Sequence, residues 1–180
     1  CNRPLNAVDL IAEKSETTTI PGNADLSPKQ RLSRVERFYN PFHEMLDLAI
    51  SQKIDRGVRP GIIAVHSFNP LYKGVSRPWE IGIIHDDEDE WALAIVDRLR
   101  ANDSMTVGVN EPYSPKDRVY FTLERHARSR GLPAVMIEIR NDEIADNKSQ
   151  QRWGGLLAEI VGDAYEELNK GAAGARAAGA

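Results

Sequence analysis

The sequence of 180 residues contains one cysteine, Cys1, which excludes an internal disulfide and any zinc site built on several thiolates. No apolar run approaches the roughly 20 residues of a membrane-spanning helix, and the start lacks the charged-then-apolar pattern of a signal peptide. Lysine and arginine are scattered along the chain and the formal net charge is −4, which argues against a nucleic-acid surface. We expect a cytoplasmic protein that acts on a small molecule, with neither nucleic acid nor membrane as a partner.

The first residue is Cys1 rather than methionine, and this allows two interpretations. One is a mature lipoprotein that carries its lipid on Cys1. The other is a sequence that begins inside a domain. The polar stretch 1–26 is typical of an irregular surface loop and does not decide between them.

Apolar periodicity predicts alternating helices and strands in the rest of the chain. The first helix is expected to start at Pro28 after the N-cap Ser27, to be amphipathic, and to kink or split at Pro41. Further helices are expected after the acidic run 86–90, over 117–130 with a stop at Gly131, and over about 148–169. The expected strands are 61–68, 79–84, 105–109 and 134–139.

This alternation predicts an α/β fold with a mostly parallel, mixed sheet that has helices on both faces. The length favours a single domain, which we place at residues 1–170. Residues 171–180 consist of glycine, alanine and one arginine, and we expect a disordered tail there.

Two of the predicted strands carry residues that can bind a metal or move a proton. His66 lies at the end of the strand 61–68, and Glu138 lies at the end of the strand 134–139. Open α/β sheets bind their ligands outside the carboxyl ends of their strands. A neutral imidazole there can hold Zn²⁺, and a carboxylate can take a proton from metal-bound water. The sequence therefore predicts a hydrolase.

Glu138 and Arg140 stand two residues apart on one predicted strand, so their side chains share a face. Two charges on the inner part of a sheet are costly unless they are paired or used. An ion pair between the two residues and a role in chemistry are both compatible with this placement.

The other three histidines are weaker candidates for a site. His43 opens a pattern close to the two-histidine zinc helix, but Asp47 stands where the second histidine should be, so we expect a surface helix residue without a role. His85 stands beside Asp86 and Asp87, where a solvated imidazole is more common than a metal site. His126 shares a partly apolar helix face, which suits either a packed, hydrogen-bonded histidine or a site residue. The acidic run 86–90 is expected to complement the positive end of a helix.

A series of short motifs follows in one order along the chain. They are Cys1-Asn-Arg-Pro4, Val65-His-Ser-Phe68, Arg77-Pro-Trp79, Asn110-Glu-Pro-Tyr-Ser114, Arg125-His126, Gly131-Leu-Pro133 and Glu138-Ile-Arg-Asn-Asp142. Together they resemble the N-formylglutamate amidohydrolase (deformylase) family over about residues 1–162. The resemblance implies a fold and site layout similar to those of the zinc carboxypeptidases, in the phosphorylase/hydrolase-like group.

The resemblance also implies roles for particular residues. His66 would be a zinc ligand and Glu138 the general base, with Asn2 and Arg3 as the clamp for a substrate carboxylate. A guanidinium suits that clamp because its donors match carboxylate geometry. Arg140 would add charge near the developing oxyanion, and Tyr113 and His126 would line the pocket.

The other zinc ligands of such enzymes, a histidine and an acid, come from a segment before the Asn-Arg pair. We therefore expect the domain to be incomplete at its N-terminus, with the first strands and the remaining ligands upstream of Cys1. The implied activity is removal of a formyl or other small acyl group from an N-acyl acidic amino acid. Two alternatives stay open: a non-catalytic relative that binds acidic metabolites through Arg3 and Arg140, and a zinc peptidase or amidase with a larger acyl substrate.

Overall fold

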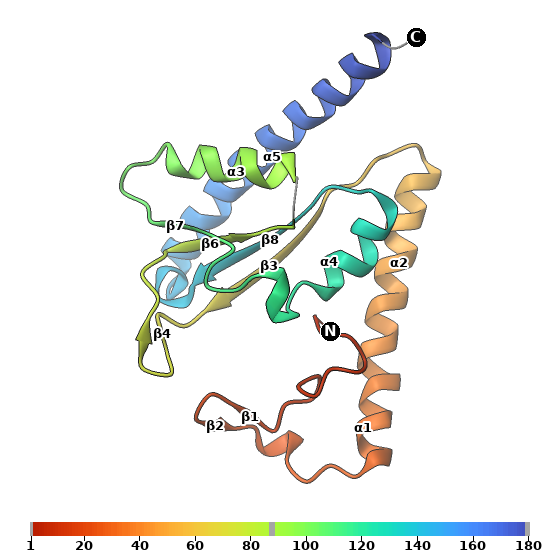
Figure 1. Ribbon diagram of the computed structural model, residues 1–180, viewed down its shortest axis with the longest axis vertical. Helices are drawn as coiled ribbons and strands as arrows, with labels where there is room; N and C mark the ends of the chain where they lie inside the picture. Colours follow the sequence, from red (N-terminus) through yellow and green to blue (C-terminus); the bar gives the residue numbers. More distant parts are fainter. Residues whose placement is uncertain (1, 87–88, 179–180) are drawn as a thin grey trace.

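The computed structural model describes residues 2–86 and 89–178, so the expectations for Cys1 and for positions 87 and 88 lie outside the described residues. Its centre is a four-stranded sheet with the order β3-β8-β6-β7 (Figure 1). The strands are β3 Ile62–Phe68, β6 Ile81–Ile84, β7 Val107–Val109 and β8 Ala134–Arg140. All four predicted strands are present, but β3 starts one residue later than predicted, β6 and β7 start two residues later, and β8 runs one residue further.

The sheet is mixed, as predicted. β3 runs parallel to β8, and β6 runs parallel to β7, whereas β6 is antiparallel to β8. The carboxyl ends of β3 and β8 therefore lie at the same end of the sheet, and the carboxyl end of β6 lies at the opposite end. His66 and His85 consequently belong to opposite ends of the sheet.

Helices cover both faces of the sheet, which confirms the predicted α/β architecture (Figure 1). On one face, α3 Glu90–Arg100 and α5 Asn147–Ala178 pack over buried isoleucines and valines of β6 and β8. On the other face, α4 Phe121–His126 and Ile50 of α2 Asn40–Asp55 join a second apolar cluster around Met136. Among the described residues, no helix has the length and apolar character needed to cross a membrane.

The predicted N-cap Ser27 is present, and the structure adds a second cap at Asp89. Ser27 and Gln30 form a capping box at the start of α1 Pro28–Arg34. The side chain of Asp89 accepts hydrogen bonds from the backbone N–H groups of Trp91 and Ala92 and so caps α3. The acidic run thus acts at a helix start, as expected, through Asp89 and Glu90.

The first helix does not break at Pro41. A π-helical turn, η2 Val35–Tyr39, joins α1 to α2, and the N–H of Asn40 bonds to the carbonyl of Val35. The wider turn absorbs the proline, which has no N–H to donate. Phe38 and Met45 are 66% and 64% exposed, so part of the apolar stripe lies in solvent, while Tyr39 and Ile50 lie on the buried side.

Several expectations of burial and order are corrected by the structure. β3 is an edge strand rather than a buried one, and Val65 is 62% exposed, because β8 pairs with it on one side only. The predicted helix 117–130 is reduced to α4, flanked by the 3-10 turns η3 Pro115–Asp117 and η4 Arg128–Arg130. α5 continues to Ala178, into the segment expected to be disordered, as its alanines favour a helix.

Irregular segments of the sequence contain short elements that the periodicity did not reveal. The N-terminal loop holds the hairpin of β1 Lys14–Ser15 and β2 Thr18–Thr19, followed by the 3-10 turn η1 Pro21–Asn23. The loop after β3 holds the hairpin of β4 Leu71–Tyr72 and β5 Val75–Ser76. A last 3-10 turn, η5 Asn141–Ile144, links β8 to α5.

Candidate active site

His66 and Glu138 lie side by side on neighbouring strands. The parallel register of β3 and β8 pairs His66 with Glu138, so the two side chains project from the same face of the sheet. This face is the one covered by α4. The structure therefore brings together the two residues that the sequence selected as candidates for metal binding and proton transfer.

Glu138 is a buried carboxyl group with an unpartnered oxygen. The residue is 4% exposed, and its Oε2 has no hydrogen-bond partner. Burial raises the pKa of Glu138 to about 7, although the positive charge of Arg77 works in the opposite direction. A carboxylate with a pKa near neutrality can accept and return a proton at physiological pH.

His66 has the properties of an available neutral imidazole. The residue is accessible to solvent, yet the surrounding protein removes enough water to lower the pKa of its ring. Within the described residues, no group forms a hydrogen bond to either ring nitrogen. A neutral ring with free nitrogens can coordinate a metal or bind a substrate.

Arg77 is a third member of this site, and the sequence reasoning did not assign it a role. Its guanidinium lies over the rings of Tyr72, Tyr113 and Phe68, at 4.4, 4.9 and 5.9 Å from their centroids. It also donates a hydrogen bond from Nη1 to the Tyr113 hydroxyl at 3.2 Å. The only signal in the sequence was the motif Arg77-Pro-Trp79, because nothing local shows that an arginine will be buried.

Two glycines allow the loop that carries Tyr113 to reach the sheet. Gly82 pairs with Glu138 across β6 and β8, and an added Cβ there would collide with the backbone carbonyl of Glu111. At Gly108 an added Cβ would lie 2.9 Å from the Trp79 ring. The loop after β7 therefore crosses the face of the sheet next to Glu138, and this position brings Tyr113 over Arg77.

Arg140 does not pair with Glu138, which answers one alternative of the sequence analysis. Its guanidinium binds Asp142 at 2.8 Å and Glu143 at 3.1 Å, and it donates to the carbonyl oxygen of Pro78. The carboxylates of Asp142 and Glu143 raise the pKa of Arg140, and the hydrogen bond that Arg140 donates to Asp142 contributes most. Arg140 therefore ties the end of β8 to the start of β6 and to η5.

Asn2 and Arg3 are held beside the start of α4. The Asn2 side chain accepts a hydrogen bond from the N–H of Thr122 at 3.3 Å. Arg3 donates to the carbonyl of Asp117 at 2.6 Å and forms an ion pair with Asp9 at 3.1 Å. A substrate carboxylate at Arg3 would have to compete with Asp9.

His43 and His126 form a buried pair, which corrects the expectation that His43 is a surface residue. His43 is 1% exposed and His126 is fully buried, because α2 and α4 pack together at this point. Nδ1 of His126 lies 2.8 Å from Asp47 and its Nε2 lies 2.6 Å from Nδ1 of His43. Both ring nitrogens of His126 are thus engaged, as the packed-histidine interpretation expected.

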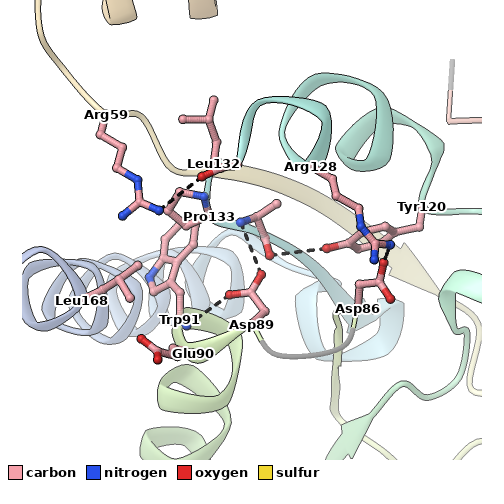
Figure 2. A pocket seen from close by; sticks show the side chains of 12 residues that line it. Arg59, Asp86, Asp89, Glu90, Trp91, Tyr120, Arg128, Leu132, Pro133 and Leu168 are labelled. Carbon is pink, nitrogen blue, oxygen red and sulfur yellow. Dashed lines mark hydrogen bonds and ion pairs between the residues drawn. The ribbon is translucent and has the colours of Figure 1, made fainter. Parts of the chain in front are cut away.

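A pocket lined by several charged residues lies at the opposite end of the strands. Figure 2 shows this pocket of about 340 Å³, lined by Arg59, Asp86, Asp89 and Arg128 among others. Its charges already serve the fold, since Asp86 pairs with Arg128 and Asp89 caps α3.

This pocket is separate from the site around Glu138. Its lining residue Ala134 lies four residues before Glu138, roughly 13 Å along the strand. His85 lies at the same end of the strands as this pocket, and its Nδ1 forms a hydrogen bond with the carbonyl oxygen of Asp86.

Among the described residues, one side chain of this site, His66, is suited to bind zinc. His66 has the right chemistry, but a catalytic zinc needs about three protein ligands. Residues 2–86 and 89–178 contain no group of three histidine, cysteine, aspartate or glutamate side chains that could hold a metal ion. The chemistry that these residues support directly is therefore proton transfer by Glu138 and charge stabilisation by Arg77.

Comparisons with known proteins agree with the fold. The chain is similar to the crystal structure of gene product Atu2144 from Agrobacterium tumefaciens, with a TM-score of 0.87 and 40% sequence identity. The match covers 94% of this chain and 67% of that one. Among curated proteins, no match was found.

The fold and site thus define an α/β protein with a buried catalytic-type carboxyl group at a strand end. The family model of N-formylglutamate amidohydrolase matches residues 1–145, and the chain belongs to this family. The match confirms the resemblance that the motifs indicated. Membership implies a hydrolase that acts on an amide bond.

Proposed function

We propose that this protein removes the formyl group, or another small acyl group, from an N-acyl acidic amino acid such as N-formylglutamate. The observation that carries the proposal is Glu138, which is 4% exposed, has an unpartnered Oε2 and has a pKa of about 7. Family membership supports the amide as the bond that is cleaved. The choice of an acidic amino acid as substrate agrees with Arg77, whose positive charge acts on Glu138.

In the proposed reaction, Glu138 acts first as a general base. Its carboxylate accepts a proton from a water molecule, and the water oxygen forms a bond to the formyl carbon. Glu138 then returns the proton to the amide nitrogen as the C–N bond breaks, which yields formate and the free amino acid. A group with a pKa near the working pH can perform both transfers efficiently.

Zinc is part of the proposal, with His66 as one ligand. When bound, the metal would polarise the formyl carbonyl and lower the pKa of the attacking water. The lowered pKa of His66 supports this role, because a neutral imidazole is the form that binds a metal. Asn2 and Arg3 remain proposed as a clamp for a substrate carboxylate, and Arg140, Tyr113 and His126 remain proposed contributors to the pocket.

The proposal is tested by Glu138→Gln and release of formate from N-formyl-L-glutamate. We expect the variant to lose roughly 10²- to 10⁴-fold in kcat, because glutamine keeps the shape but cannot accept the proton. KM should change little, and the variant should remain folded. An equal loss of kcat and of folded protein would make Glu138 a structural residue. Turnover of N-acetyl or longer acyl substrates without the formyl compound would favour the peptidase or amidase alternative, and binding without any turnover would favour the non-catalytic one.

A further inference from the structure

Arg77 is a buried cation whose positive charge acts on Glu138 but which has no salt-bridge partner among the described residues. It is 9% exposed, and within residues 2–86 and 89–178 it forms no salt bridge. Arg140, a partly buried arginine of this region, is by contrast paired with two carboxylates. An unpaired buried charge costs free energy, so proteins keep one mainly where a bound ligand supplies the opposite charge.

The surroundings of Arg77 hold its guanidinium in a fixed orientation. The rings of Tyr72, Tyr113 and Phe68 contact it, and among the described residues only the Tyr113 hydroxyl accepts a hydrogen bond from its side chain. A guanidinium has five N–H donors, so several remain for a ligand. Rigid stacking lowers the entropy cost of binding and preserves the planar fork that matches a carboxylate.

The position of Arg77 places such a ligand beside the reacting group. Its hydrogen-bond partner Tyr113 follows the loop segment that approaches Gly82, which pairs with Glu138, and its backbone N–H is anchored to the carbonyl of Pro70 at the base of the β4–β5 hairpin. A small acidic amino acid that contacts Arg77 would therefore carry its amide within reach of Glu138. Arg3 is less free for this task, because Asp9 already occupies its guanidinium.

We propose that Arg77, held by Tyr72, Tyr113 and Phe68, is the binding site for one carboxylate of the substrate, and that it determines selectivity for acidic amino acids if this is the side-chain carboxylate. The inference rests on the proposed function for the identity of the substrate. It assigns Arg77 a role in binding, distinct from the proton transfer at Glu138.

The test compares three substrates that differ by one carboxylate: N-formylglutamate, N-formylglutamine and the α-amide of N-formylglutamate. We expect Arg77→Met to raise KM for N-formylglutamate roughly 30- to 1000-fold and to remove the preference over one of the two amides. If N-formylglutamine is no longer the poorer substrate, Arg77 binds the side-chain carboxylate. If the α-amide is no longer the poorer substrate, Arg77 binds the α-carboxylate. An equal loss on all three substrates, or an unchanged preference, would overturn the inference.

Two further variants separate binding from folding. Arg98→Met is the matched control, because Arg98 is a partly buried arginine on α3 that pairs with Glu167 at 2.7 Å, and its loss should leave the preference unchanged. Arg77→Lys keeps the charge without the planar fork, and we expect it to fold and to lose an intermediate part of the preference. An Arg77→Lys variant with wild-type preference would contradict the requirement for the guanidinium.

Calorimetric titration with glutarate distinguishes this inference from the proposed function. Glutarate carries two carboxylates and no amide, so it reports binding without turnover. Binding by the wild-type chain that is lost in Arg77→Met would support the inference even if no formyl compound were hydrolysed. Equal binding by both proteins would overturn it, whatever the hydrolytic activity.

Discussion

Nδ1 of His43 lies 2.6 Å from Nε2 of His126, and the second nitrogen of His126 lies 2.8 Å from Asp47. Asp47 follows His43 by one turn of α2, so His126 of α4 fits between them. Asp47 accepts a hydrogen bond, which places a proton on Nδ1 of His126. His43 must then donate from Nδ1, and its Nε2 carries no proton, which agrees with the lack of a partner for that buried atom.

This relay predicts acid sensitivity of the fold. Burial, together with the charge of Arg125 and the neighbouring His126, lowers the pKa of His43 from 6.5 to about 4, although Asp47 opposes the shift. The unfolded chain therefore takes up a proton before the folded one, and stability should fall as the pH falls from about 6.5 towards 4. Each unit of difference in pKa corresponds to about 1.4 kcal/mol.

The measurement is the free energy of unfolding in urea at pH 7.5 and at pH 5, for the wild type and for His43→Asn. Asparagine keeps a donor near the position of Nδ1 and does not titrate in this range. We expect the variant to be less stable at pH 7.5 but to lose less stability on acidification. A steeper loss in the variant would show that His43 is not the group that responds to acid.

The raised pKa of Glu138 predicts opposite effects of pH on activity and on stability. The base is active when deprotonated, so kcat should rise with pH and level off above about 7. As the pH rises, Glu138 loses its proton near pH 4.5 in the unfolded chain but only near pH 7 in the folded one. Glu138 should therefore lower the free energy of unfolding progressively between pH 4.5 and 7. Glu138→Gln should therefore gain melting temperature relative to the wild type between pH 5 and pH 8. A constant difference across this range would be inconsistent with a shifted Glu138.

Gly82→Ala should disturb the site through the loop after β7. The added methyl group would meet the carbonyl of Glu111 and lie 3.2 Å from Pro112 Cδ, both on the segment that leads to Tyr113. We expect a loss of about 2 kcal/mol in unfolding free energy, with a larger fall in kcat/KM. Gly162→Ala is the control, because it has open space in α5 and should be neutral or stabilising. Equal behaviour of the two variants would disprove the close approach at Gly82.

The zinc proposal predicts weak metal binding by the chain of 180 residues taken alone. Residues 2–86 and 89–178 offer His66 but no group of three ligands, and about three are needed for a catalytic site. Metal analysis after dialysis should find well below one zinc per chain. One tightly held zinc that disappears in His66→Ala would show that the other ligands also lie within this sequence.

Local features of the fold were predictable from the sequence. Ser27 and Asp89 identify helix starts, because a capping side chain needs only the backbone N–H groups two or three residues ahead. The apolar, β-branched runs of β3 and β8 identify strands for a similar reason, since each run lies within seven consecutive residues. His66 and Glu138 could be selected as strand-end residues, and the motif order indicated the family.

Only the tertiary structure decided how distant residues meet. The sequence expected His43 on the surface, but its exposure depends on α4, which begins 78 residues later. Strand order made β3 an edge strand, and this left Val65 in solvent despite its apolar side chain. Arg77 acquired its aromatic surroundings from β3, β4 and the loop after β7. Hydrogen bonds along a helix or a strand are encoded by neighbours in sequence, whereas burial and charge pairing depend on which elements pack together, and that packing determined the environment of Glu138.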